Sequence, residues 1–213
     1  MVLVVAGAGA WYGYQRFVEP SCSGQVRLNV AAATEIAPAV QAAAGDWAAD
    51  GAAVDGVCVA VQVVAADAVD VAATVAARHG VTLAGVGEAS GTAVVPDVWV
   101  PDSSLWLLRL RTAASGFEPE NAASVARSPV VVAMPEPIAA TAGWPDKKIG
   151  WTTLLQQITS GTRLRTGIVE PTRDAAGLSG LLALGAAAGG AGAGPKTTKA
   201  IRALATGRSA LRQ

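Results

Sequence analysis

Short apolar runs alternate with segments of helical periodicity along the first half of the chain. Three runs have the length and β-branched content of buried strands, and after each of them apolar residues recur at helical spacing. The predicted strands are residues 26–33, 57–65 and 97–100, and the predicted helices are residues 35–49, 67–79 and 103–114. Strands that alternate with helices predict a parallel sheet with helices on its faces, and therefore an α/β fold.

The second half of the chain repeats the pattern less regularly. A valine-rich run bounded by prolines at residues 128–134, and a shorter run at residues 167–169, predict two further strands. Helical spacing predicts helices over residues 149–158 and 174–184. Alanine and glycine dominate residues 185–195, and this composition predicts a flexible surface loop.

Small polar residues stand where one predicted strand ends and a helix begins. Pro101 stops the strand, and Asp102, Ser103 and Ser104 follow at the start of the helix. Such residues accept hydrogen bonds from the first backbone N–H groups of a helix, and this end of a helix attracts anions and polar groups. A cap that serves only its own helix is the alternative interpretation.

The same arrangement recurs at two other places. Pro171 ends the short strand and Thr172, Arg173 and Asp174 open the next helix, and Thr34 follows the first strand in a weaker version. In open α/β sheets, ligands bind beyond the carboxyl ends of the strands. The recurrence therefore favours a ligand site over three unrelated helix caps.

Charge and glycine spacing exclude several classes of partner. The chain has 16 basic and 16 acidic residues, so it lacks the basic excess of a nucleic-acid-binding protein. The glycines of residues 7–9 are followed by Gly13 one place too late for a dinucleotide-binding turn, and Gly85, Gly87 and Gly91 fail the same test. The sequence predicts no nucleic-acid partner and no cofactor.

The beginning of the chain is apolar. Residues 2–14 end in aromatic side chains, and Arg16 follows, as at the interfacial end of a membrane helix. The run is shorter than the roughly 20 residues that span a bilayer. Residues 1–19 therefore predict a partial membrane anchor or a signal segment, with an N-terminal core strand as the alternative. An anchor or signal places the protein outside the cytoplasm, on the membrane or at the cell surface.

Cys22 and Cys58 are the only cysteines. In an exported chain they predict a disulfide, because exported proteins fold in oxidising compartments. Two buried free thiols are the alternative. Two cysteines and the single His79 make a zinc site improbable, so no metal site is predicted.

Enzymatic chemistry finds little support in the sequence. A Ser-His pair would require His79, at a predicted helix end, to meet Ser103 or Ser104, and no Gly-x-Ser-x-Gly turn is present. Asp97 and Asp102 lie too close together along one strand for glycosidase geometry. The chain is therefore predicted not to be an enzyme.

Several stretches together carry a family resemblance that covers residues 22 to about 184. They are Cys22 with residues 27–33 and 35–38, and residues 55–59, 96–104, 128–135, 143–145 and 170–178. The chain resembles bacterial extracytoplasmic solute-binding proteins of the type II periplasmic-binding class. It is similar in particular to actinobacterial membrane-anchored proteins that join such a domain to a von Willebrand factor A domain.

The resemblance implies two α/β lobes, residues 20–127 and 128–213, with a ligand in the cleft between them. The second lobe looks incomplete, and the Asp-x-Ser-x-Ser pattern of a von Willebrand factor A domain is absent. The chain is therefore expected to be a fragment of a longer protein, in which that domain is a possible partner.

By the resemblance, ligand-binding residues are expected in both lobes. They are Thr34, Asp102, Ser103, Ser104, Ser128, Thr172, Arg173 and Asp174. The serine turn and Thr172 are expected to face each other across the cleft and to hold a small polar or anionic solute. Arg173 would supply charge, unless Asp174 or Glu170 pairs with it. The alternative function is an adhesive or scaffold module that uses the same fold for protein contacts.

Overall fold

The computed structural model of the protein describes residues 22–91, 93–160, 167–187, 194–195, 198–199 and 202. The chain divides into two compact units, each treated by itself below. The first comprises Met1–Leu83 and Glu88–Phe117, and the second comprises Ala84–Gly87 and Glu118–Gln213. The lobe ranges expected from the sequence stay a prediction.

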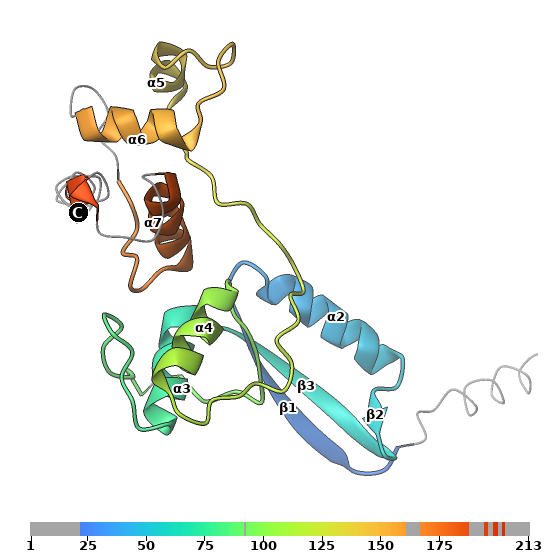
Figure 1. Ribbon diagram of the computed structural model, residues 1–213. Helices are drawn as coiled ribbons and strands as arrows, with labels where there is room; N and C mark the ends of the chain where they lie inside the picture. Colours follow the sequence, from blue (N-terminus) through green and yellow to red (C-terminus); the bar gives the residue numbers. More distant parts are fainter. Residues whose placement is uncertain are drawn as a thin grey trace, which may run out of the picture. The chain divides into compact units, whose positions relative to one another are not determined.

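The first unit is an α/β sheet structure, and its predicted elements are confirmed to within two residues at each end. Its elements are β1 (Gln25–Ala32), α2 (Ala37–Ala49), β2 (Ala53–Val54), β3 (Val57–Ala65), α3 (Ala68–Arg78), β4 (Val98–Val100) and α4 (Ser104–Ala113) (Figure 1). The strand order is β2-β3-β1-β4. β1 pairs in parallel with β3 along its whole length, from Gln25 opposite Cys58 to Ala32 opposite Ala65.

The short strand β2 was not expected from the sequence. It pairs antiparallel with the start of β3 through a turn at Asp55 and Gly56, whose φ angles are 50° and 77°. An Asp-Gly pair is typical of a two-residue hairpin turn, because both central residues take positive φ. The signal was therefore present, but Ala53 and Val54 are too few for the apolar pattern to reveal a strand.

β4 is aligned against β1 by a carboxylate at its start. The Asp97 Oδ2 atom accepts hydrogen bonds from the Asn29 backbone N–H at 2.8 Å and from the Asn29 side-chain amide at 3.0 Å. The parallel ladder then continues to Ala32 opposite Val100. β1, β3 and β4 therefore end level with one another.

Burial increases along β1 toward its carboxyl end. Side chains alternate between faces, and neighbouring residues in a parallel register share a face. One face therefore carries the aliphatic side chains of Val26, Leu28, Val30, Val59, Val61 and Val63. On this face Val26 is 51% exposed at the start of β1, whereas Val30 is 6% exposed near its end. The core of this unit lies at the carboxyl half of the sheet.

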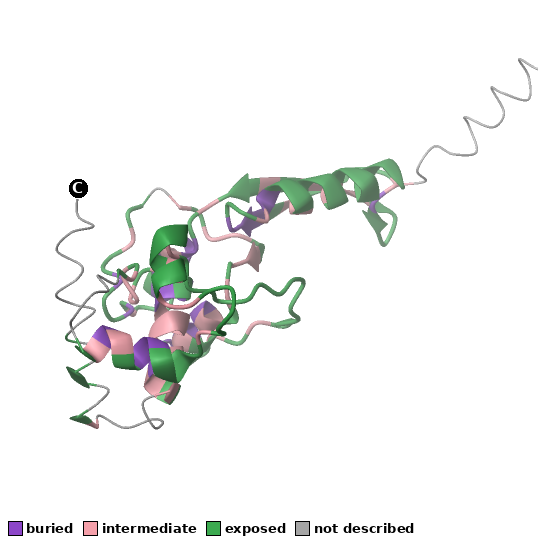
Figure 2. Cartoon of the chain, turned by 90° about the horizontal axis from the view of Figure 1, so that it is seen from above, coloured by how far each residue is buried: buried purple, intermediate pink, exposed green. Residues whose placement is uncertain are grey.

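The helices contribute unequally to the core of this unit. α3 and α4 contact each other and contribute most of the buried helical residues: Ala68, Val71, Ala72, Ala73, Val75, Ala76, Trp106 and Leu110. In α2 only Ala37 is buried, and Figure 2 shows this helix exposed along most of its length. Alanine side chains are small, so an alanine-rich helix buries little apolar area against the strands that it contacts. α2 therefore adds little to the core.

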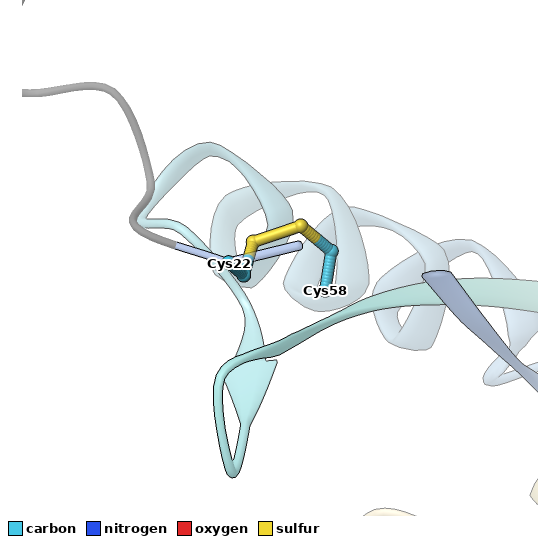
Figure 3. The surroundings of a disulfide bond; sticks show 2 residues. All are labelled: Cys22 and Cys58. Carbon is cyan, nitrogen blue, oxygen red and sulfur yellow. A yellow bond between two sulfur atoms is a disulfide. The ribbon is translucent and has the colours of Figure 1, made fainter. Parts of the chain in front are cut away.

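A disulfide joins Cys22 to Cys58, with the two Cα atoms 5.1 Å apart (Figure 3). The prediction of this bond is confirmed, and the free-thiol alternative is wrong. The bond connects the residue three positions before β1 to the second residue of β3. It therefore closes the amino-terminal end of the sheet, where β1 is most exposed.

The second unit is helical among its described residues. It contains α5 (Glu136–Thr141), α6 (Trp151–Ser160) and α7 (Ala175–Ala187). Its core is formed by Leu154, Leu155 and Ile158 of α6 with Leu184 of α7, and Ile168 and Leu181 pack beside them. The helices predicted at 149–158 and 174–184 are thus confirmed.

Two other expectations for this unit are wrong, and the loop expected at residues 185–195 is wrong for residues 185–187, whereas residues 188–193 lie outside the described residues. Residues 128–134 and 167–169 form no strand, and Val131 is 73% exposed. A valine-rich segment becomes a strand only where a neighbouring strand supplies hydrogen bonds, and none lies beside these segments in the described part of the unit. Residues 185–187, expected in a loop, continue α7, because alanine favours helix.

Among the described residues no helix is long and apolar enough to cross a membrane. The predicted anchor or signal segment, residues 1–19, lies outside the described residues.

Reducing the disulfide should destabilise the first unit markedly. The bond joins residues separated by 36 positions, and the chain-entropy account assigns about 4 kcal/mol to a loop of this size. Urea unfolding with and without dithiothreitol measures the difference in the free energy of unfolding. The double variant Cys22→Ser, Cys58→Ser is the control, and its midpoint should not respond to dithiothreitol. Equal midpoints for oxidised and reduced wild type would contradict the expected contribution.

Candidate functional site

Three polar residues occupy equivalent positions beyond the level strand ends of the first unit. Thr34, Asp67 and Asp102 each lie two residues past the register-matched ends of β1, β3 and β4. The strands stay joined one residue further, because the backbone N–H groups of Ala33 and Ala66 donate to Val100 and Ala32 at 2.9 Å. The carboxyl end of the sheet therefore carries a hydroxyl group and two carboxylates.

Asp67 is the member of this group that the sequence analysis did not propose as a ligand residue. Its side chain is exposed and makes no capping hydrogen bond to α3, although it is the residue before that helix. The signal was its position after the strand at 57–65, which matches the positions of Thr34 and Asp102 after their strands.

The start of α4 is fixed by two local hydrogen bonds. Ser103 Oγ accepts a hydrogen bond from the Leu105 backbone N–H at 3.2 Å, so this serine is the helix cap that its position predicted. Asp102 Oδ1 accepts from the indole Nε1 of Trp106 at 2.8 Å. Ser104 begins the helix and is exposed. The Ser103 hydroxyl can still donate its proton, because a hydroxyl both donates and accepts.

Trp106 is the anchor of this turn. It is 2% exposed, and the guanidinium carbon of Arg109 lies 4.8 Å from the centre of its ring. Burial lowers the pKa of Arg109 from its ordinary value. The indole of Trp106 thus contacts a carboxylate through its N–H group and a cation over its face.

The turn before α7 is fixed in a different way. Thr172 Oγ1 donates to Glu170 Oε1 at 3.0 Å, and Asp174 Oδ1 accepts from the Gly177 backbone N–H at 2.6 Å. Arg173 Nη1 donates to the backbone carbonyl of Val86. The guanidinium group of Arg173 is thus held by a backbone carbonyl.

The expected ligand residues fall into two groups and one outlier. In the first unit, the carboxyl end of the sheet carries Thr34, Asp102, Ser103 and Ser104. In the second unit, the turn before α7 carries Thr172, Arg173 and Asp174. Ser128 lies in an exposed extended segment of the second unit and not in a strand. That the two groups face each other across a cleft stays a prediction.

In the described ranges no group of three or more His, Cys, Asp or Glu side chains is placed to hold a metal ion. His79 follows the last residue of α3, and its ring meets that of Phe117 edge to face at 5.8 Å. This contact gives the histidine a packing role at the end of the helix.

Removing the indole N–H of Trp106 should destabilise the first unit. Trp106→Phe is expected to cost about 1.5–3 kcal/mol, because the lost hydrogen bond is made to a carboxylate. Urea unfolding measures this cost. Asp102→Ala provides the control, since it should cost less in the Trp106→Phe protein than in the wild type if the two groups interact. Costs that simply add would show that the bond contributes nothing to stability.

Comparison with known protein families gives a match over residues 28–212 to the family described as bacterial extracellular solute-binding protein. Comparisons with curated proteins and with solved structures gave no significant match. The matched range includes the first unit from residue 28 onward and nearly all of the second unit, together with both groups of expected ligand residues. The chain belongs to the bacterial extracellular solute-binding protein family.

Proposed function

We propose that this protein captures a small polar or anionic solute outside the cytoplasm, in a cleft between two lobes of the type II arrangement. The observation that carries the proposal is the family match over residues 28–212. The Cys22–Cys58 disulfide agrees with it, because such bonds persist in oxidising compartments. Membrane attachment through residues 1–19, and a von Willebrand factor A domain as a partner in a longer chain, belong to the same proposal.

In the first unit the hydroxyl groups of Thr34, Ser103 and Ser104 would bind the solute. All three follow the carboxyl ends of strands, where open α/β sheets bind their ligands. A hydroxyl group donates one hydrogen bond and accepts others, so the carboxyl end of this sheet suits an oxygen-rich solute. Asp102, held by Trp106, would accept hydrogen bonds from the solute.

In the second unit Arg173 would supply the positive charge. A guanidinium group has five N–H donors in a planar fork, and the Val86 carbonyl accepts from Nη1. The remaining donors suit a carboxylate or another oxyanion, which arginine can bind through two hydrogen bonds. Thr172 would contribute its oxygen as an acceptor, since its proton is donated to Glu170.

A thermal-shift screen of the purified protein tests this function. The screen compares oxyanions, amino acids, short peptides and sugars at constant ionic strength. A solute that binds only the folded state stabilises it by about 2.7 kcal/mol at 100 times its Kd, so Tm should rise for one class. No rise with any class would contradict the proposal and favour the adhesive-module alternative.

Deleting two hydroxyl groups should weaken solute binding strongly. A contact to each hydroxyl is worth about 1 kcal/mol for a neutral partner group and up to about 3 kcal/mol for a charged one. The double variant Ser103→Ala, Thr172→Ala should therefore raise the Kd of any solute found in the screen more than tenfold, as measured by calorimetric titration. Loss of the Ser103 cap should cost about 1 kcal/mol of stability, which leaves the protein folded.

The matched control is Thr112→Ala, Ser115→Ala, which removes two exposed hydroxyl groups near the other end of α4. Its Kd should stay within twofold of the wild type. Equal affinities for the two double variants would remove these hydroxyl groups from the site.

A further inference from the structure

A short segment from the middle of the sequence contacts the turn that holds Thr172 and Arg173. We infer that Gly85 and the backbone carbonyl of Val86 are positioning groups, which hold Thr172 and Arg173 in the orientation that binds the solute. The inference rests on the proposed function and adds residues that do not themselves touch the solute.

The Ala84–Gly87 segment belongs to the second unit, although the residues on both sides of it belong to the first. Val86 is 4% exposed, and the glycines on either side of it have φ angles of 75° and 88°. Positive φ is accessible to glycine with little strain. The two glycines therefore let the backbone turn so that Val86 is buried.

Gly85 lies against the side chain of Thr172. A Cβ atom added at Gly85 would lie 2.5 Å from Thr172 Cβ, 2.6 Å from Cγ2 and 2.9 Å from Oγ1. All three distances are below van der Waals contact, and Cβ of Thr172 cannot move without its backbone. The close approach requires glycine, so this position fixes where the threonine hydroxyl lies.

The next residue fixes the arginine. Val86 offers its carbonyl to Arg173 Nη1 across 87 positions of sequence. One hydrogen bond at a corner of the planar guanidinium restricts the rotation of the whole fork. A side chain that is already held in place loses less conformational entropy when a solute binds, and its affinity is correspondingly higher.

α7 restrains the same turn through another glycine. A Cβ atom added at Gly177 would lie 2.5 Å from the carbonyl oxygen of Val169 and 3.4 Å from Cα of Pro171. The backbone N–H of Gly177 also donates to Asp174. The turn is thus held both by its own helix, α7, and by the Ala84–Gly87 segment. Of these two, only the Ala84–Gly87 segment contacts the side chains of Thr172 and Arg173 directly.

A matched pair of variants tests the inference. Gly85→Ala and Gly87→Ala both place alanine at positive φ, but a Cβ atom at Gly87 meets nothing within 4 Å. The first readout needs no solute and is the guanidinium N–H spectrum of Arg173 by NMR. Resolved Nη–H signals are expected for the wild type and Gly87→Ala and should be lost in Gly85→Ala. Retention of these signals in Gly85→Ala would overturn the inference.

The second readout is the affinity for inorganic sulfate, titrated at constant ionic strength and followed on the Arg173 Nε–H signal. Gly85→Ala should weaken sulfate binding at least fivefold, and Gly87→Ala should change it less than twofold. Equal effects of the two variants would overturn the inference. Failure of the wild type to bind sulfate would instead contradict the anionic solute of the proposed function, while the guanidinium signals still decide the positioning role.

A third variant covers the case in which Gly85→Ala does not fold. Gly85→Ala combined with Thr172→Gly removes every Thr172 atom that the new methyl group would meet. The resolved Arg173 signals should return in this protein. Their absence from a folded double variant would overturn the inference, because no clash with Thr172 would then remain to displace the Val86 carbonyl from Arg173.

Discussion

Parallel pairing of β1 with strands on both sides determines where the polar groups of the first unit lie. β1 meets β3 along its whole length and β4 at its end, so the three strands finish level at Ala32, Ala65 and Val100. Asp97 maintains the second pairing through its hydrogen bonds to Asn29. The residues two positions further along each strand therefore lie together at the carboxyl end of the sheet. They follow directly on the end of β1, which is the buried part of the sheet.

The two polar turns are held by contrasting means. The turn before α4 depends on hydrogen bonds between neighbours in the sequence, from Leu105 to Ser103 and from Trp106 to Asp102. The turn before α7 depends in addition on a distant segment, in which Gly85 packs on Thr172. Local caps form wherever the sequence permits a helix, whereas a distant contact forms only in the folded unit. The geometry of the turn before α7 therefore depends on the rest of the unit more than that of the turn before α4 does.

The sequence predicted those parts that depend on local pattern or on simple counting. The strands and helices of the first unit follow from apolar periodicity, and the Cys22–Cys58 bond follows from two cysteines in an exported chain. Residues 128–134 misled the pattern, because valine content cannot show whether a partner strand exists. The contact of Gly85 was equally hidden, because the spacing of glycines along a sequence says nothing about their packing.

The central proposal is that a solute is bound by the residues that follow the level strand ends of the first unit and by the turn before α7. Backbone amide shifts in an NMR titration, with the solute that raises Tm most, test it most directly. The account predicts that the largest shifts occur at Thr34, at residues 102–104 and at residues 172–176. Shifts confined to α2 or to residues 128–134, with these amides unchanged, would contradict it.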